Sequence, residues 1–202
     1  MKHEGSSPAP PPSSLGVALS DEQVGLLGRF ESLLRERAVP LGFVAAADES
    51  RLRERHIWDC LRAASVIRPD ERTGYDLGSG AGLPGLVVAI ACPWLEITLA
   101  ESRRPRVAFL ELALERLSLP NARVQAGRVQ DLDDKVDVCL ARAFANAVSS
   151  WRIAEPLLAP GGRLVYFAGR GADSLQRPNG LVVSLVASTL ARSGPLVIMS
   201  RQ

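Results

Sequence analysis

Apolar residues recur with helical spacing near the start of the chain. The positions, three to four residues apart, are Leu26, Phe30, Leu33 and Leu34. Before them, "SDEQ" has the capping-box pattern, in which the side chains of Ser20 and Gln23 each accept a bond from the other residue's backbone amide. We therefore expect a helix from Ser20 to about Arg37, ended by Pro40 and Gly42.

A second helical pattern covers residues 49–67, "ESRLRERHIWDCLRAASVI". One face carries the apolar residues Ile57, Cys60, Leu61 and Ala64, which we expect to pack on the core. A second face carries Arg51, Arg55 and Arg62 as a basic stripe. Such a stripe is usually a solvated surface.

From residue 73 onward, short apolar runs of strand length alternate with helical stretches. The expected strands cover residues 73–78, 96–102, 122–127, 135–141 and 163–169, and the expected helices cover 84–93, 103–119 and 147–162. Two more apolar runs, 181–188 and 195–200, follow with too little chain between them for a crossover helix. This order predicts an α/β fold, with a mostly parallel seven-stranded sheet, helices on both faces and an antiparallel last strand.

The amino-acid composition limits the classes of protein to which this chain can belong. With 202 residues, 47% of them apolar, the chain fits one core with appendages, and residues 1–16 read as a disordered tail. No run has the length of a membrane span or the pattern of a signal peptide, so we expect a cytoplasmic protein. The three cysteines and two histidines are widely spaced, which predicts neither disulfides nor a metal site.

The net charge of +2 does not by itself demand a nucleic-acid partner. All but two of the 24 basic residues are arginine, which genomic composition alone can explain. Arginine clusters still matter, because the guanidinium fork binds phosphate with two parallel hydrogen bonds.

The stretch "DLGSGAGLPG", residues 76–85, follows the first expected strand and has two readings. In the first, Asp76 holds the ammonium end of S-adenosylmethionine, while Gly78 and Gly80 leave room for the rest of that cofactor. In the second, Gly80 begins a dinucleotide motif. The first reading explains more residues, since Asp76 ends the strand and Gly85 becomes a small residue at the helix start.

Glu101, at the end of the next strand, is placed to bind a ribose, which both cofactors contain. Arg103 and Arg104 would suit a 2′-phosphate and keep a phosphorylated dinucleotide open. With lysine only at positions 2 and 135, however, no Tyr-x-x-x-Lys proton relay can form.

Several motifs occur together in a recognisable order: "RHIWDCL", "DLGSGAGLPG", "LAESRRPRVAFL", "AGRVQD", "ARAFA" and "APGGRL". Over residues 20–202 the chain resembles the 16S ribosomal RNA guanine-N7 methyltransferase G family, also called the glucose-inhibited division protein B family. The resemblance implies a class I, Rossmann-like methyltransferase domain at 71–202, with a helical N-terminal extension at 17–70. It also implies S-adenosylmethionine as donor and a guanine of the ribosome's decoding region as target.

Matching the family's motifs position by position implies a set of cofactor contacts. With their loop neighbours, these are Asp76, Gly78, Ser79, Gly80, Gly82, Leu83, Glu101, Ser102, Arg128, Val129, Gln130 and Arg142. Arg142 is also the expected catalytic residue, stacking on or hydrogen-bonding a flipped guanine. An ion pair from Arg142 to Asp76 or Glu101 is the structural alternative.

RNA contacts are expected around the mouth of the site. The candidates are Arg51, Arg55, His56, Arg62, Arg103, Arg104 and Arg170 on the RNA side, with Arg106 beside them. His56 and Asp59 match the family's His-x-x-Asp, for which a hydrogen bond within the extension helix is the structural alternative to direct chemistry.

The chain also departs from the family pattern. Gln130 stands where members usually carry an acid, and Ala168 stands where they usually carry a lysine. "GFVAAAD" replaces the usual Asn-Leu-Thr before the second helix, and Arg192 is the candidate for the family's arginine before the last strand. Most of these differences lie on the RNA side of the site.

Guanine N7 has a lone pair and no proton, so methylation there needs positioning and no general base. A sequence without a nucleophile-base pair agrees with this reaction. We expect a monomer acting on 16S RNA of the 30S subunit, without metal or membrane. A same-fold enzyme with another RNA or small-molecule substrate, and a relative that binds but does not turn over, remain alternatives.

Overall fold

The computed structural model describes residues 13–169, 181–190 and 193–202. The expected capping box is present at the first long helix, α1 (Asp21–Leu33): Ser20 Oγ accepts from the Gln23 amide at 3.2 Å, and Gln23 Oε1 accepts from the Ser20 amide at 2.8 Å. Gln23 also donates through Nε2 to the Ile90 carbonyl, 2.8 Å away. The cap therefore starts the helix and docks it on the rest of the molecule.

The remainder of the extension is helical with irregular turns. A π-helical turn (Leu34–Ala38) prolongs α1, and the second helical segment runs through Ala46–Arg51 and Arg53–Trp58 into α2 (Asp59–Ala64). The turn Ser13–Leu15 precedes α1, and Leu15 is buried. Regular structure thus begins before Ser20, inside the expected tail, whose residues 1–12 lie outside the described chain.

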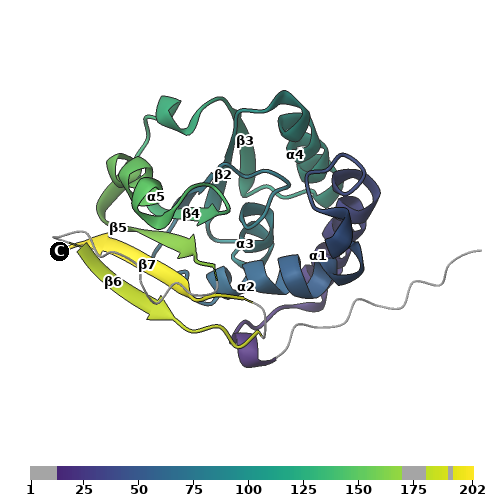
Figure 1. Cartoon of the computed structure of the whole chain (residues 1–202), viewed down its shortest axis with the longest axis horizontal. Helices are drawn as coiled ribbons and strands as arrows, with labels where there is room; N and C mark the ends of the chain where they lie inside the picture. The colour runs from purple at the N-terminus through teal and green to yellow at the C-terminus, as the bar shows by residue number, and fades with distance from the viewer. Residues whose placement is uncertain (1–12, 170–180, 191–192) are drawn as a thin grey trace, which may run out of the picture.

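Seven strands form one sheet in the order β3-β2-β1-β4-β5-β7-β6 (Figure 1). The strands are β1 (Thr73–Leu77), β2 (Glu96–Glu101), β3 (Ala122–Ala126), β4 (Val136–Arg142), β5 (Leu158–Phe167), β6 (Leu181–Val186) and β7 (Leu196–Arg201). The first five pair in parallel, and β7 is antiparallel to both β5 and β6. The expected mostly parallel sheet with an antiparallel last strand is confirmed.

Alternation along the strands separates two apolar cores. On β4, Val138 and Leu140 face one core while Cys139 and Ala141 face the other. The first core includes α3 (Gly85–Ala91), α4 (Arg104–Leu117) and the extension. The second includes α5 (Ala147–Ala154). The extension therefore belongs to the core of the sheet's first face.

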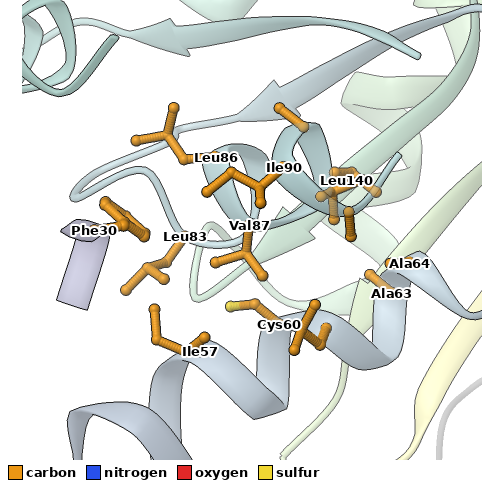
Figure 2. Close-up of a cluster of buried hydrophobic side chains, with 14 of the residues drawn as sticks. Phe30, Ile57, Cys60, Ala63, Ala64, Leu83, Leu86, Val87, Ile90 and Leu140 are labelled. Atoms are coloured by element: carbon orange, nitrogen blue, oxygen red, sulfur yellow. The ribbon is translucent and has the colours of Figure 1, made fainter. Parts of the chain in front are cut away.

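Figure 2 shows the contact between the extension and the first core. Ile57 and Cys60 on the extension helix point toward Val87 of α3, and Phe30 of α1 lies near Leu83. Because these side chains are buried together, the extension and the sheet form one hydrophobic unit.

A buried ion pair joins the end of the extension to the middle of β5. Arg163 Nε and Nη2 donate to the two carboxylate oxygens of Glu71 at 2.6 and 2.8 Å, and Nη2 also donates to the Val66 carbonyl. Arg163 is 2% exposed, so this pair is fully desolvated. Removal of either partner would leave an uncompensated buried charge.

The last expected helix is shorter than its pattern indicates. It ends at Ala154, and residues 158–162, assigned to the helix from sequence, begin β5 instead. Leu158 pairs with Val136 and Arg163 with Val138, so the register shifts between these pairs and leaves Pro160 and the glycines that follow as extra residues on β5. Pairing with β4 therefore overrides the local helical pattern, and the expected stop at Pro160 is wrong.

Gly85, at the start of α3, is packed too closely for any side chain. A Cβ there would lie 2.3 Å from Leu99 Cδ2 and 2.6 Å from Asp76 Oδ2. The small residue expected at this helix start is thus required by contact with β1 and β2.

We predict that Gly85→Ala destabilises the fold by about 1–3 kcal/mol, because an added methyl overpacks this junction. Gly25→Ala is the matched control. Gly25 lies inside α1 with only Arg29 Nη1, 3.8 Å away, near its added Cβ, so helix propensity should stabilise that variant by up to about 1 kcal/mol. Urea unfolding measures both, and equal effects would contradict the packing argument.

Candidate active site

A cavity of about 1020 Å³ opens at the carboxyl ends of β1, β4 and β5. Three parts of the molecule line it: the extension between Phe43 and Asp59, the glycine loop from Gly78 to Leu83, and the ends of β4 and β5 with Gly194. Ligands of open parallel sheets bind at this edge. The extension therefore forms one wall of the expected site.

The glycine loop has the backbone geometry that its sequence predicts. Gly78, Gly80 and Gly82 have φ values of 70°, 59° and 80°, which favour glycine. A Cβ on Gly78 would lie 2.6 Å from the Phe144 ring. The buried Ser79 donates its hydroxyl to the Asp76 carbonyl at 3.0 Å, which holds the loop against β1.

Asp76 lies beneath the loop and does not line the cavity. It is 1% exposed, and its Oδ2 accepts from the Gly85 amide at 3.0 Å. Burial raises the pKa of this carboxyl to about 7, although hydrogen bonds oppose the shift. The sequence predicts that Asp76 contacts the cofactor's ammonium group directly. The position of Asp76 does not match this prediction, because its side chain faces the start of α3.

Glu101 holds the loop from the side. Its Oε1 accepts from the amides of Ser102 and Arg103 at 2.8 and 2.9 Å, and its Oε2 accepts from the Gly80 amide at 3.0 Å. A carboxylate has about four acceptor positions, so one remains for a ribose hydroxyl. Glu101 is where the sequence predicts it, but it also has a structural role.

Four more of the expected cofactor contacts lie outside the cavity. The exposed Ser102, Arg128 and Gln130 and the buried Val129 follow β2 and β3, whose ends are joined by a 3.0 Å bond from the Gly127 amide to the Glu101 carbonyl. The cofactor surface predicted from sequence thus continues from the loop along these strand ends.

Arg142, at the end of β4, contacts the extension. Its Nε donates to Asp59 Oδ2 at 3.3 Å, and Nη2 lies 3.1 Å from His56 Nδ1 and 3.3 Å from the Arg55 carbonyl. The alternative of an ion pair to Asp76 or Glu101 is therefore wrong. Arg142 lines the cavity while the extension holds its guanidinium.

His56 connects Arg142 to Asp48. His56 Nδ1 accepts from Arg142, so Nε2 carries the proton that is donated to Asp48 Oδ2 at 3.3 Å. Burial and the Arg142 charge lower the pKa of His56 despite Asp48, so the ring is neutral at pH 7. The proposed hydrogen bond between His56 and Asp59 is not formed, since each has other partners.

Arg62 does not belong to a basic surface. It is 5% exposed, and its guanidinium donates to Asp59 Oδ1 and to the Gly194 carbonyl. The expected RNA contact at this position is wrong, because the helix face that carries Arg62 turns toward the end of β5 and the loop before β7. Arg62 also lies 5.8 Å from the Phe167 ring, so a cation occupies this edge even though Ala168 is not lysine.

The other arginines are placed more nearly as expected. Arg51 and Arg55 line the cavity with partly exposed side chains, both near Asp48, and Arg103 and Arg104 are exposed where α4 begins. Arg106 lines the cavity and stacks 5.7 Å over the Phe43 ring. Arg170 and Arg192 lie outside the described residues.

Sequence reasoning missed two residues. Asp48, 8% exposed, forms an ion pair with Arg55, accepts from His56 and is part of the wall, but it lies eight positions before His56 and has no helical relation to it. Phe144 packs on Gly78. The quoted "ARAFA" contains Phe144, yet nothing in the motif indicates that contact.

The described residues hold no group of three or more histidine, cysteine or acidic side chains suited to a metal ion. Within the same part of the chain, no helix is long and apolar enough to cross a membrane. All three cysteines are buried and free, and burial raises the pKa of the Cys60 and Cys92 thiols to about 12. They are core residues and not nucleophiles.

Solved structures support the fold. The molecule is similar to a SAM-dependent methyltransferase from Aquifex aeolicus (TM-score 0.58, 14% identity, covering 79% of this chain and 97% of that one). It is also similar to a putative O-methyltransferase from Klebsiella pneumoniae (TM-score 0.60, 12% identity, covering 88% and 90%). At these identities the likeness concerns the fold alone, and it confirms the expected methyltransferase architecture.

Sequence relatives identify the family. The profile of rRNA small subunit methyltransferase G matches residues 23–179. Proteins named ribosomal RNA small subunit methyltransferase G are 37% identical in Thermobifida fusca, over 81% of this chain and 69% of the relative, and 37% identical in Burkholderia thailandensis, over 79% and 73%. The chain therefore belongs to the rRNA small subunit methyltransferase G family and is an enzyme that methylates small-subunit ribosomal RNA with S-adenosylmethionine.

Proposed function

We propose that the enzyme transfers the methyl group to N7 of one guanine in 16S RNA, acting as a monomer on the 30S subunit in the cytoplasm. The observation that carries this proposal is the cavity between the glycine loop and the extension. Apart from Glu54 and Tyr166, its ionisable side chains pair with other charged or polar side chains, as Arg142 does with His56 and Asp59. A site that positions groups without supplying a strong base suits N7, which carries no proton.

The cofactor would lie along the carboxyl ends of β1 to β3. The glycine loop leaves space for its methionine part, while Glu101 offers one remaining acceptor to the ribose. Val129 and Gln130 are proposed for the adenine, with Gln130 accepting from the exocyclic amine. Asp76 contributes by holding Gly85 and so the loop's exit into α3.

The guanine would enter the cavity beside Arg142. N7 must keep its lone pair for the methyl group, so a guanidinium donor can assist only from the neighbouring O6. Arg142 is suited to this contact because the extension fixes its orientation. Phosphates of the RNA would be bound by Arg51, Arg55, Arg103 and Arg104 at the rim.

A labelled-donor assay tests the substrate. We expect incorporation of the methyl group into undermethylated 30S subunits well above that into free 16S RNA, with no labelling of fully methylated subunits. Incorporation into small molecules or other RNA would support a drifted substrate. Tight cofactor binding by calorimetry without any transfer would instead identify a relative that binds but does not turn over.

We predict that reversing the charge of Arg103 and Arg104 to glutamate weakens RNA binding and flattens its salt dependence by a log–log slope of about one per lost phosphate contact. Each single reversal, Arg103→Glu or Arg104→Glu, is compared with Arg116→Glu in the last turn of α4, which makes the same change in net charge. Filter binding at several salt concentrations measures the slope. An equal slope change in the control would remove this patch from the RNA footprint.

Asp76 should make stability depend on pH. Its folded-state pKa of about 7 lies above the ordinary value of 3.8. The protonated carboxyl therefore contributes to folding stability at low pH, and this contribution is lost as the pH rises through 7. Asp76→Asn has no such titration. Relative to wild type, the variant should therefore gain on the order of 4 kcal/mol between about pH 4 and pH 8. A pH-independent difference in urea unfolding would contradict the assigned pKa.

A further inference from the structure

We infer that Arg62 is a positioning residue of the methyl-transfer site, acting on Arg142 through Asp59. This inference rests on the proposed role of Arg142 beside the cofactor and the guanine. Arg62 lies behind Asp59 on the extension helix and is almost fully buried. Because Arg62 is buried at this point, an RNA contact does not explain its position.

The guanidinium of Arg62 joins two parts of the molecule. Nε and Nη2 both donate to Asp59 Oδ1, at 3.1 and 2.6 Å, and Nη1 donates to the Gly194 carbonyl at 3.0 Å. The planar fork of arginine uses two nitrogens for the carboxylate oxygen and the third for the carbonyl, whereas an ammonium group presents a single nitrogen. Arg62 therefore fixes Asp59 relative to the loop before β7.

Asp59 carries this constraint to the site. Arg62 occupies Oδ1, which leaves Oδ2 facing Arg142 Nε at 3.3 Å. Both arginines carry a positive charge, so each attracts the buried Asp59 carboxylate that lies between them. Without Arg62, Asp59 would turn toward Arg142 and alter the angle at which that guanidinium enters the cavity.

Arg62 also supports the opposite wall. Its guanidinium lies 5.8 Å from the Phe167 ring, and Gly194, whose carbonyl it binds, is pressed against the chain after β5. A Cβ on Gly194 would lie 2.3 Å from the Ala168 carbonyl oxygen. Phe167 and Gly194 both line the cavity, so one side chain sets the distance between its two walls.

Arg163 provides a matched control in the same chain. It is equally buried, grips a carboxylate through Nε and Nη2, and binds a backbone carbonyl of the extension. It is the sixth residue of β5 and does not line the cavity, whose first lining residue on that strand is Tyr166. Loss of either arginine removes similar chemistry, but only loss of Arg62 disturbs Arg142.

The experiment compares Arg62→Met and Arg163→Met with wild type. Both should lower Tm to a similar extent. The Nε–Hε NMR signal of Arg142, assigned by its loss in Arg142→Lys, should shift in Arg62→Met and stay in place in Arg163→Met. Single-turnover methyl transfer to 30S subunits, per folded enzyme, should fall about 10- to 100-fold in Arg62→Met and less than about 2-fold in Arg163→Met.

Arg62→Lys keeps the positive charge but not the guanidinium that binds both Asp59 and Gly194. It should therefore shift the same Arg142 signal, with a smaller loss in the rate of methyl transfer. If Arg62→Met does not fold, Arg62→Lys replaces it in the comparison with Arg163→Met. An Arg142 signal unchanged in the Arg62 variants, or equal rate losses for Arg62 and Arg163, would overturn the inference. The NMR signal needs no RNA substrate, so it decides the role of Arg62 even if transfer to 16S RNA is not found.

Discussion

The carboxylate of Asp59 is the contact on which the cavity depends. One oxygen binds Arg62, which reaches the loop before β7, and the other binds Arg142, which ends β4. A single side chain of the extension thus sets the distance between three parts of the wall. Because the three groups are buried or half-buried, none can be removed without leaving a charge poorly paired.

The remaining charged groups near the site follow the same principle. Asp76 and Glu101 accept hydrogen bonds from backbone amides of the glycine loop and its flanks, and Asp48 orients His56. Each carboxylate therefore fixes the shape of the protein, and Asp76, whose pKa is raised to about 7, does not line the cavity. This arrangement fits methyl transfer to an atom that has a free lone pair, where catalysis consists of alignment and exclusion of water.

Much of the fold could be predicted from the sequence because its signals are local. The capping box at Ser20 and the alternation of strands with helices each follow from neighbouring residues. The site was predicted less well. Arg62 looked like a surface residue because helical spacing does not show where β7 and its loop will lie. The partners of Arg142 and the end of α5 likewise depend on contacts between segments far apart in the chain.

The position of the transferred methyl group tests the account most directly. N7-methylguanine in RNA is reduced by borohydride and then cleaved by aniline, so the modified nucleotide appears as a strand break. After incubation of undermethylated 30S subunits with enzyme and S-adenosylmethionine, we predict one new break in 16S RNA, at a guanine, in proportion to the incorporated label. Incorporated label without a break would place the methyl on another atom and contradict a site built only to align N7.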